Sequence, residues 1–245
     1  MTSLVMGLLG SGEFEPWAEA VDRWLLERAR VGDGSVLILP TASAPEGDEV
    51  FDGWAEKGLA HYRRLGVEAE VLPLKTRGDA GEERFIAALE RASMAFVSGG
   101  NPAYLASALN GTPFWEALKR ALGRGLAYGG CSAGVAALGE RSPDSSLDKL
   151  TEEFWQPGLG LFPGMYFGPH WDALDGYVPG LRDFFVAAVP PTGRLLAVDE
   201  DTAVVGDGAR WSVVGSGAAH LLQGGVWRHF GSGEAFVAEL RLGTA

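Results

Sequence analysis

The stretch LAYGGCSAGVAAL, residues 126–138, contains the pattern that decides the fold class. A short apolar run, Leu126–Tyr128, leads into the pentapeptide Gly130-Cys131-Ser132-Ala133-Gly134, and the small apolar residues Val135–Leu138 follow it. G-x-S-x-G between a strand and a helix is typical of a nucleophile elbow, a turn so tight that only small neighbours fit around the serine. The stretch therefore predicts a parallel-sheet α/β fold in which Ser132 projects above the carboxyl end of a strand. The helix that begins there directs free N–H groups and its positive dipole end at the same point, which suits an oxyanion.

Further apolar runs come before this stretch, and amphipathic patterns lie between them. Val21 and Leu118 sit at the centres of two such patterns, with charged residues on the opposite helical face. Apolar runs that alternate with amphipathic helices indicate parallel strands joined by crossover helices. The predicted strands before residue 126 are Leu4–Leu9, Ser35–Leu39, Val67–Leu72 and Met94–Val97.

The composition changes after about residue 140, where Gly, Pro, Ser and Asp become frequent. The later apolar runs are short and closely spaced, with turn-forming residues rather than convincing helices between them, so we expect antiparallel hairpins that finish the sheet edge. We therefore predict a doubly wound, mostly parallel sheet with crossover helices and antiparallel strands in the C-terminal part. Without a repeat or a linker, residues 1–245 are expected to form one domain. The later runs are Leu195–Val198, Ala203–Val205, Trp211–Val214, Ala218–Leu222, Val226–Phe230 and Ala235–Leu240.

Composition and charge exclude several classes of function. The 245 residues carry 20 Lys and Arg against 32 Asp and Glu, a net charge of −12, which makes nucleic acid an unsuitable partner. The single cysteine, Cys131, can form neither an internal disulfide nor a structural zinc site, so we expect a reducing, cytoplasmic location. The apolar start, Met1–Gly10, lacks a basic leader and is too short to span a membrane, so we expect a buried strand there.

A second glycine-containing loop follows the predicted strand before the elbow. The segment Phe96–Asn101 ends in Gly99, Gly100 and Asn101, so its backbone can approach a substrate carbonyl closely. Both loops lie at the carboxyl ends of parallel strands, and an N–H of the glycine loop can act as a second oxyanion donor.

A serine nucleophile needs a base, and histidine is the usual one. The chain has four histidines. We expect His61 to be exposed on a charged helix and His220 to be a satisfied sheet residue, while His229 lies between Arg228 and Phe230 near the end. His170 follows Gly168-Pro169 at the end of an apolar run, so it is the best candidate for the base.

The third member of a triad is a carboxylate that orients the imidazole. Asp172 and Asp175 are close to His170 in the sequence, while Asp199-Glu200-Asp201 directly follows the predicted strand Leu195–Val198. The sequence alone does not choose between these candidates.

The order of serine, histidine and acid resembles that of the serine peptidase family that contains cyanophycinase and the aspartyl dipeptidase called peptidase E. The order in α/β-hydrolases is different. The resemblance covers most of the chain. It rests on Leu39-Pro40-Thr41-Ala42-Ser43, Gly99-Gly100-Asn101, Gly130-Cys131-Ser132-Ala133-Gly134, Gly168-Pro169-His170 and Asp199-Glu200-Asp201-Thr202-Ala203.

This resemblance implies a role for each matching residue. Ser132 would be the nucleophile, His170 the base and Glu200 the orienting acid, with oxyanion donors from the Gly100 and Ala133 amides. Gly99 and Asn101 belong to the same substrate-binding loop. The resemblance also implies a fold like the class I glutamine amidotransferase domain, no metal or organic cofactor, and a small peptide substrate such as an aspartyl dipeptide or a cyanophycin-like isopeptide.

A departure from the family pattern leaves alternatives open. The family tends to place arginines shortly after the histidine, whereas Trp171–Asp175 is acidic and aromatic, so an aspartate-binding pocket would need Arg182 or Arg194. A non-catalytic binding protein of the same fold is the main alternative. A thiol enzyme that uses Cys131 is a weaker one, because Ala133 then stands where the elbow needs glycine. A homodimer is the assembly that we consider, with Trp155 and Trp171 as candidate pocket or interface residues.

Overall fold

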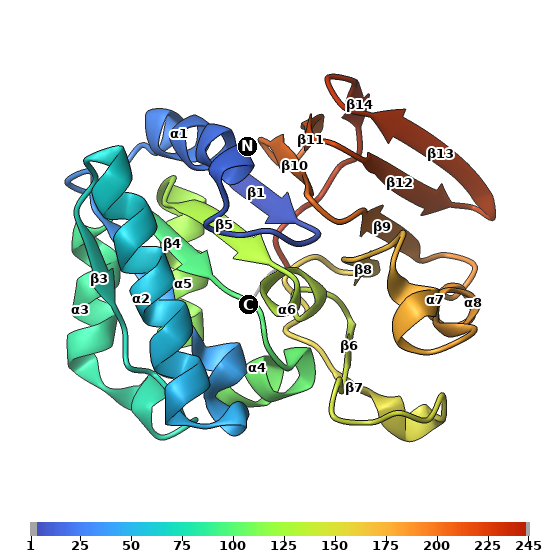
Figure 1. Ribbon diagram of the computed structural model, residues 1–245, viewed down its shortest axis with the longest axis horizontal. Coiled ribbons are helices and arrows are strands. Elements are labelled where there is room, and N and C mark those ends of the chain that lie inside the picture. Colours follow the sequence, from blue (N-terminus) through green and yellow to red (C-terminus); the bar gives the residue numbers. More distant parts are fainter. Residues whose placement is uncertain (1–3, 244–245) are drawn as a thin grey trace.

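The structure is a computed structural model that describes residues 4–243. Within these residues, eight strands form a central sheet in the order β14-β11-β10-β1-β5-β4-β2-β3 (Figure 1). The strands β1, β5, β4, β2 and β3 pair in parallel, as the apolar runs predict. These strands span Met6–Leu9 for β1, Val36–Leu39 for β2, Ala69–Val71 for β3, Met94–Val97 for β4 and Ala127–Cys131 for β5.

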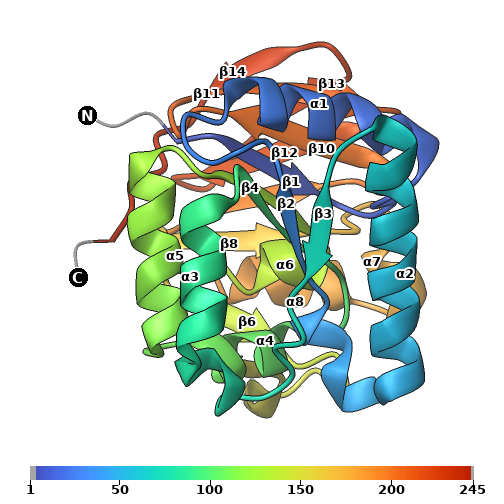
Figure 2. The same cartoon turned by 90° about the vertical axis from the view of Figure 1, so that its left-hand side faces the viewer.

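Helices cover both faces of the parallel strands, which confirms the doubly wound fold. Figure 2 shows α3 and α5 on one side of the strands and α2 on the other. In β2, Leu37 and Leu39 belong to the buried cluster that contains α3 and α5, while Val36 and Ile38 belong to the cluster that contains α1 and α2. This alternation explains the continuous apolar runs, because both faces of each strand are buried. The helices are α1 (Glu19–Arg28), α2 (Asp48–Leu65), α3 (Glu83–Arg91), α4 (Pro102–Leu109) and α5 (Pro113–Arg124).

The helix α5 has clear start and stop signals. The side chain of Thr112 accepts a hydrogen bond from the backbone N–H of Trp115 at 3.2 Å, and Pro113 occupies the first turn. Gly125 ends the helix in the left-handed region at φ 109°. The chain then turns directly into β5, which leads to Ser132.

The C-terminal strands divide between two sheets, so the prediction that they all finish one sheet edge was wrong. β10, β11 and β14 extend the central sheet in antiparallel fashion, but β13, β12, β9 and β8 form a second sheet. The cause is the parallel pairing of β9 with β8, which draws the β12–β13 hairpin to the far side of β9. These strands are β8 (Met165–Gly168), β9 (Arg194–Val198), β10 (Thr202–Gly206), β11 (Arg210–Gly215), β12 (Ala218–Gln223), β13 (Val226–Gly231) and β14 (Ala235–Val237).

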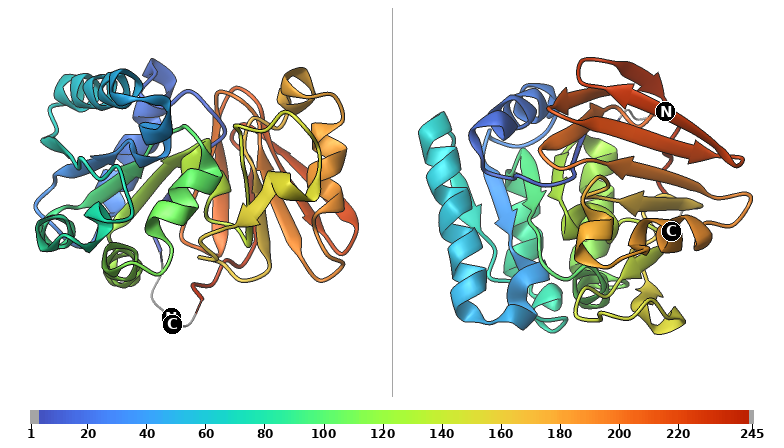
Figure 3. Two further views of the ribbon diagram at one scale, coloured as in Figure 1. Left: turned by 90° about the horizontal axis from the view of Figure 1, so that it is seen from below. Right: turned by 45° about the vertical axis from the view of Figure 1, so that its right-hand side comes forward.

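After the elbow helix α6, which the motif predicts, come short elements that the sequence patterns did not predict. Two helices connect β8 to β9, and a small antiparallel pair, β6 with β7, follows the elbow helix α6. In Figure 3 the yellow to red strands, which belong to the second sheet and to the antiparallel part of the central sheet, lie beside the green and blue parallel strands. The elements are α6 (Ala133–Ala136), β6 (Arg141–Pro143), β7 (Trp155–Pro157), α7 (Leu174–Tyr177) and α8 (Leu181–Ala187). Short 3-10 turns lie at Pro16–Ala18, Thr41–Glu46, Asp79–Gly81 and Glu152–Phe154.

One buried apolar cluster crosses from the central sheet to the second sheet. It contains Leu8 and Val97 from the parallel strands together with Leu196 and Leu221 from β9 and β12. The boundary of one domain over residues 1–245 stays a prediction. No helix within residues 4–243 is long and apolar enough to cross a membrane.

Candidate active site

The elbow forms where the G-x-S-x-G motif predicts it. β5 ends at Cys131, Ser132 has φ 51° and ψ −108°, and α6 begins at Ala133. A Cβ atom at Gly134 would lie 2.2 Å from the carbonyl oxygen of Val97, so only glycine lets the two strand ends approach this closely. α6 is a single turn, so the helix dipole that we expected to favour an oxyanion here is small. The oxyanion environment must therefore come from individual N–H groups.

The structure brings Ser132 and His170 into direct contact. His170 follows β8, the strand that pairs with β9, and its Nε2 atom lies 2.8 Å from Ser132 Oγ. Its Nδ1 atom lies 3.0 Å from Glu200 Oε1. Because a carboxylate can only accept, Nδ1 carries the proton and Nε2 is left to accept from the serine hydroxyl. This is the tautomer that general-base catalysis needs.

The fold selects Glu200 among the acidic candidates. Asp172 accepts the backbone N–H of Glu200 at 2.8 Å, so it orients the acid loop rather than the imidazole. Asp175 accepts the backbone N–H of Arg182 at 3.0 Å. Asp199 lies 2.9 Å from His220 Nε2. Each of these three alternatives has another partner, and among the described acidic candidates Glu200 is the one that bonds His170.

The surroundings of Glu200 favour its charged form. The hydrogen bond to His170, and after it the hydrogen bond from the Tyr177 hydroxyl at 2.9 Å, lower the pKa of Glu200. Burial, followed by the bond to Glu200, raises the pKa of Tyr177 to about 12, so this hydroxyl keeps its proton and remains a donor. The Tyr177 ring stands edge-on to His170 with 5.8 Å between ring centroids. The sequence carries no signal for Tyr177, which comes from a helix that the patterns did not predict.

The glycine loop presents one free N–H beside Ser132. Gly100 has φ 136°, and a Cβ there would lie 2.3 Å from the carbonyl carbon of Ala42, so this position requires glycine. Within residues 4–243 no acceptor takes the N–H of Gly100 or of Ala133. The N–H of Gly99, in contrast, donates to Glu13 Oε1 at 2.9 Å. The N–H groups of Gly100 and Ala133 are therefore available to bind an oxyanion, whereas the N–H of Gly99 is already bonded to Glu13.

The buried carboxylate of Glu13 holds this loop, and the motif analysis missed it. Glu13 is 7% exposed, and besides Gly99 it accepts the Cys131 thiol at 2.8 Å. Burial, and after it the negative charge of Glu13, raise the pKa of the Cys131 thiol well above its ordinary value. A thiolate is the reactive form of cysteine, so this environment opposes the use of Cys131 as a nucleophile. The position of Glu13 after a strand and two glycines is the signal that could have identified it.

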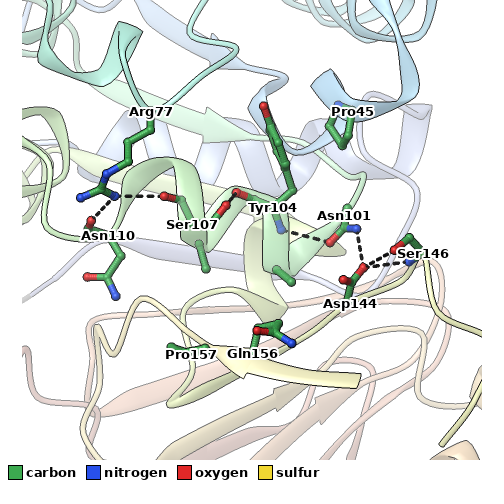
Figure 4. A pocket seen from close by; sticks show the side chains of 12 residues that line it. Pro45, Arg77, Asn101, Tyr104, Ser107, Asn110, Asp144, Ser146, Gln156 and Pro157 are labelled. Carbon is green, nitrogen blue, oxygen red and sulfur yellow. Dashed lines mark hydrogen bonds between the residues drawn. The ribbon is translucent and has the colours of Figure 1, made fainter. Parts of the chain in front are cut away.

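The side chain of Asn101 lines a neighbouring groove. Its Oδ1 atom accepts the backbone N–H of Tyr104 and caps α4, and its Nδ2 atom donates to Asp144 at 2.8 Å (Figure 4). Its backbone N–H donates to Ala42 at 2.8 Å. Asn101 thus anchors the end of the glycine loop, and its polar groups are engaged within the protein.

The other histidines lie outside the site. His61 is 1% exposed, so the expectation of an exposed residue was wrong: the charged face of α2 belongs to its neighbours, and His61 packs against α1, where it bonds Asp22 at 2.7 Å. His220 is a satisfied sheet residue, as expected, between Asp199 and His229. Within the described residues, no group of three or more His, Cys, Asp or Glu side chains is placed to hold a metal ion.

Backbone strain is concentrated around these groups. In residues 4–243 four non-glycine residues have a positive φ: Phe14, Ser132, His170 and Asp201. Two of them are members of the Ser–His pair, Asp201 follows Glu200, and Phe14 follows Glu13. Strained backbone persists where the surrounding structure enforces it, and it gathers at functional sites.

A cavity of about 300 Å³ opens beside Ser132 and His170. Gly100 and Tyr177 line it together with Ser132 and His170, and apolar side chains make most of its wall. A carbonyl that entered it would meet the serine hydroxyl and the free N–H groups together, which is the arrangement for acyl transfer.

Comparisons with known proteins agree with this geometry. A sequence model of peptidase family S51 matches residues 6–214. The chain is 25% identical over 233 residues to a cyanophycinase from Trichormus variabilis, covering 90% of this chain and 74% of that one. It is 29% identical over 215 residues to a cyanophycinase from Synechococcus elongatus, covering 82% of this chain and 62% of that one.

Two solved structures share the fold. The crystal structure of a peptidase from an acI-B1 Actinobacterium is similar with a TM-score of 0.87 and 29% identity, over 96% of this chain and 97% of that one. A putative peptidase E from Listeria monocytogenes EGD-e is similar with a TM-score of 0.62 and 18% identity, over 87% of this chain and 98% of that one. The second likeness concerns the fold alone.

Proposed function

The chain belongs to peptidase family S51, and on that premise we propose that Ser132, His170 and Glu200 are the catalytic triad with which this serine peptidase hydrolyses a small peptide or isopeptide. The observation that carries the proposal is the continuous chain of contacts from Ser132 Oγ to His170 at 2.8 Å and from His170 to Glu200 at 3.0 Å. Each contact has the polarity that proton transfer from the serine requires.

The first half of the reaction forms an acyl-enzyme. Ser132 Oγ attacks the scissile carbonyl carbon while His170 Nε2 takes the hydroxyl proton, and Glu200 stabilises the imidazolium that results. The carbonyl oxygen becomes an oxyanion, which the N–H groups of Gly100 and Ala133 are free to bind. The C–N bond then breaks, and His170 returns the proton to the leaving amine.

The second half releases the acid product. A water molecule takes the place of the amine and gives a proton to His170 as it attacks the ester carbon. The ester C–O bond breaks, and His170 returns this proton to Ser132 Oγ. The chain's own residues supply every proton transfer in the cycle.

The test combines covalent labelling with turnover. We expect a small fluorophosphonate to label Ser132 in the folded protein, and Ser132→Ala to abolish labelling and reduce turnover of dipeptides and β-aspartyl peptides by roughly 10³-fold or more. Cys131→Ala, at the residue next to Ser132, is the matched control. It should keep both labelling and turnover, because the thiol is buried and protonated.

Two outcomes would contradict the proposal. Failure of the folded wild type to label at Ser132 would favour a non-catalytic binding protein of this fold. Loss of turnover in Cys131→Ala with full turnover in Ser132→Ala would instead favour a thiol enzyme.

A further inference from the structure

The cavity beside the triad is apolar to a degree that peptide hydrolysis by itself does not require. Three of its wall residues, Leu174, Leu181 and Phe185, come from α7 and α8 and are at most 6% exposed. Phe154 reaches the same space from the segment before β7. With Val178 and Leu147, these side chains surround a volume of about 300 Å³. That volume suits one side chain better than a long polymer segment.

Among the described residues, no lysine or arginine lines this cavity. The two arginines that could have completed an acid-binding pocket are held elsewhere. Arg182 lies 3.3 Å from the Asp175 carboxylate and over the ring of Trp171. Arg194 donates to the backbone oxygen of Glu239 at 2.8 Å. A carboxylate in this cavity would lose its hydration and gain no cation, which is strongly unfavourable.

We propose that the cavity binds an apolar side chain next to the scissile bond, so that this enzyme prefers aliphatic or aromatic residues to aspartate there. The inference rests on the proposed function, because the cavity selects substrate only if Ser132 and His170 act on it. Loss of apolar contact in such a pocket changes specificity by about 10- to 200-fold per group, which sets the expected preference.

Residues 143–147 form one segment of the cavity wall. Hydrogen bonds on the side of this segment that faces away from the cavity hold it in place. Along residues 143–147, Pro143, Ser145 and Leu147 face the cavity, while Asp144 and Ser146 face the groove in Figure 4. There Asp144 Oδ1 accepts from Asn101 at 2.8 Å and from the Ser146 hydroxyl at 2.6 Å. This network ties the end of the glycine loop to the wall of the cavity.

The first experiment measures binding and turnover with four dipeptides: Leu-Ala, Phe-Ala, Ala-Leu and Asp-Ala. Each is tested for kcat/KM and for its ability to slow fluorophosphonate labelling of Ser132, which reports occupancy even without turnover. We expect Leu-Ala or Phe-Ala to exceed Asp-Ala by at least about 10-fold in either readout. A preference for Ala-Leu over Leu-Ala would place the selected side chain on the leaving-group side.

The outcomes separate this inference from the proposed function. Labelling of Ser132 together with equal or better protection by Asp-Ala overturns the apolar preference and leaves the triad standing. Absence of labelling overturns both.

The second experiment places a cation in the wall. Leu147 is 37% exposed, so Leu147→Arg can fold with its guanidinium at the cavity mouth, and Val226→Arg, at a site on β13 that is 64% exposed, is the matched control. We expect Leu147→Arg to shift the ratio of Leu-Ala to Asp-Ala toward Asp-Ala by about 10-fold, since a buried carboxylate then gains a partner. Val226→Arg should keep the wild-type ratio. An unchanged ratio in Leu147→Arg would show that this cavity does not select the substrate.

Discussion

His170 and His61 each bond a carboxylate at short range, but the two pairs lie in very different surroundings. His61 and Asp22 are both 1% exposed between α1 and α2, and the Nδ1 atom of His61 accepts from Arg64 at 3.2 Å. His170 is 21% exposed beside a cavity, and its second nitrogen faces Ser132. An acid–histidine pair is therefore a candidate catalyst only where the second ring nitrogen is left for a nucleophile and substrate can reach it.

The largest effect on turnover should come from removing His170, the histidine beside the cavity. We expect His170→Ala to lower turnover by roughly 10³-fold or more, because in the proposed mechanism His170 takes the Ser132 proton. Its thermal midpoint should stay close to that of the wild type, since the side chain is partly exposed. Steady-state kinetics with parallel thermal unfolding checks this. Full turnover in the variant would remove His170 from the mechanism.

Substitution of the buried His61 should instead lower stability and leave turnover unchanged. His61→Ala leaves the buried Asp22 carboxyl with only the Tyr62 hydroxyl at 3.0 Å, which we expect to reduce the free energy of unfolding by about 3 kcal/mol. Turnover per folded molecule should remain near the wild-type value. Urea unfolding combined with active-site labelling measures both quantities. A stable His61→Ala variant with low turnover would mean that the two pairs are coupled.

A smaller effect is expected from Glu200→Gln. The amide keeps the size of the side chain, but it is neutral and can turn its NH₂ group toward His170, which opposes the required tautomer. We expect a loss of about 10²-fold in kcat, less than for a fully buried triad acid because Glu200 is 38% exposed. The matched control is Asp199→Asn, on the neighbouring residue that pairs with His220. Equal losses in both variants would argue against a specific role for Glu200.

The smallest effect is a difference in how the two carboxyls respond to pH. Bonding to His170 lowers the pKa of Glu200, so its contribution to stability is present above the ordinary value of 4.5 and is lost as the pH falls through the lowered folded value. Burial raises the pKa of Asp22, so its contribution is complete below the ordinary value of 3.8 and is lost as the pH rises through the raised folded value.

Urea unfolding across about pH 3 to 7 tests this difference. Glu200→Gln should reduce the loss of stability that occurs as the pH falls. Asp22→Asn should reduce the loss of stability that occurs as the pH rises. If both substitutions changed the stability profile in the same direction, the opposite pKa shifts of Glu200 and Asp22 would be contradicted.

Much of the parallel half of the fold could be predicted, because its signals are local. The run Met94–Val97 is β4 with the same bounds, and the amphipathic pattern around Leu118 is α5. The C-terminal half was harder to predict. Alternating short runs there predict strands but not their partners, so the pairing of β9 with β8 and the helices between them were missed.

Local sequence patterns were enough to predict the five parallel strands and the elbow at Ser132, because each depends on the apolar pattern or the size of adjacent residues. The packing of distant segments set which of several acids bonds His170, which histidine is buried and where Arg182 is held. These outcomes depend on contacts such as that between Ser132 and His170, which are 38 positions apart. The distance between such residues, and the burial of each, are set by how the sheets pack, and no local pattern encodes them.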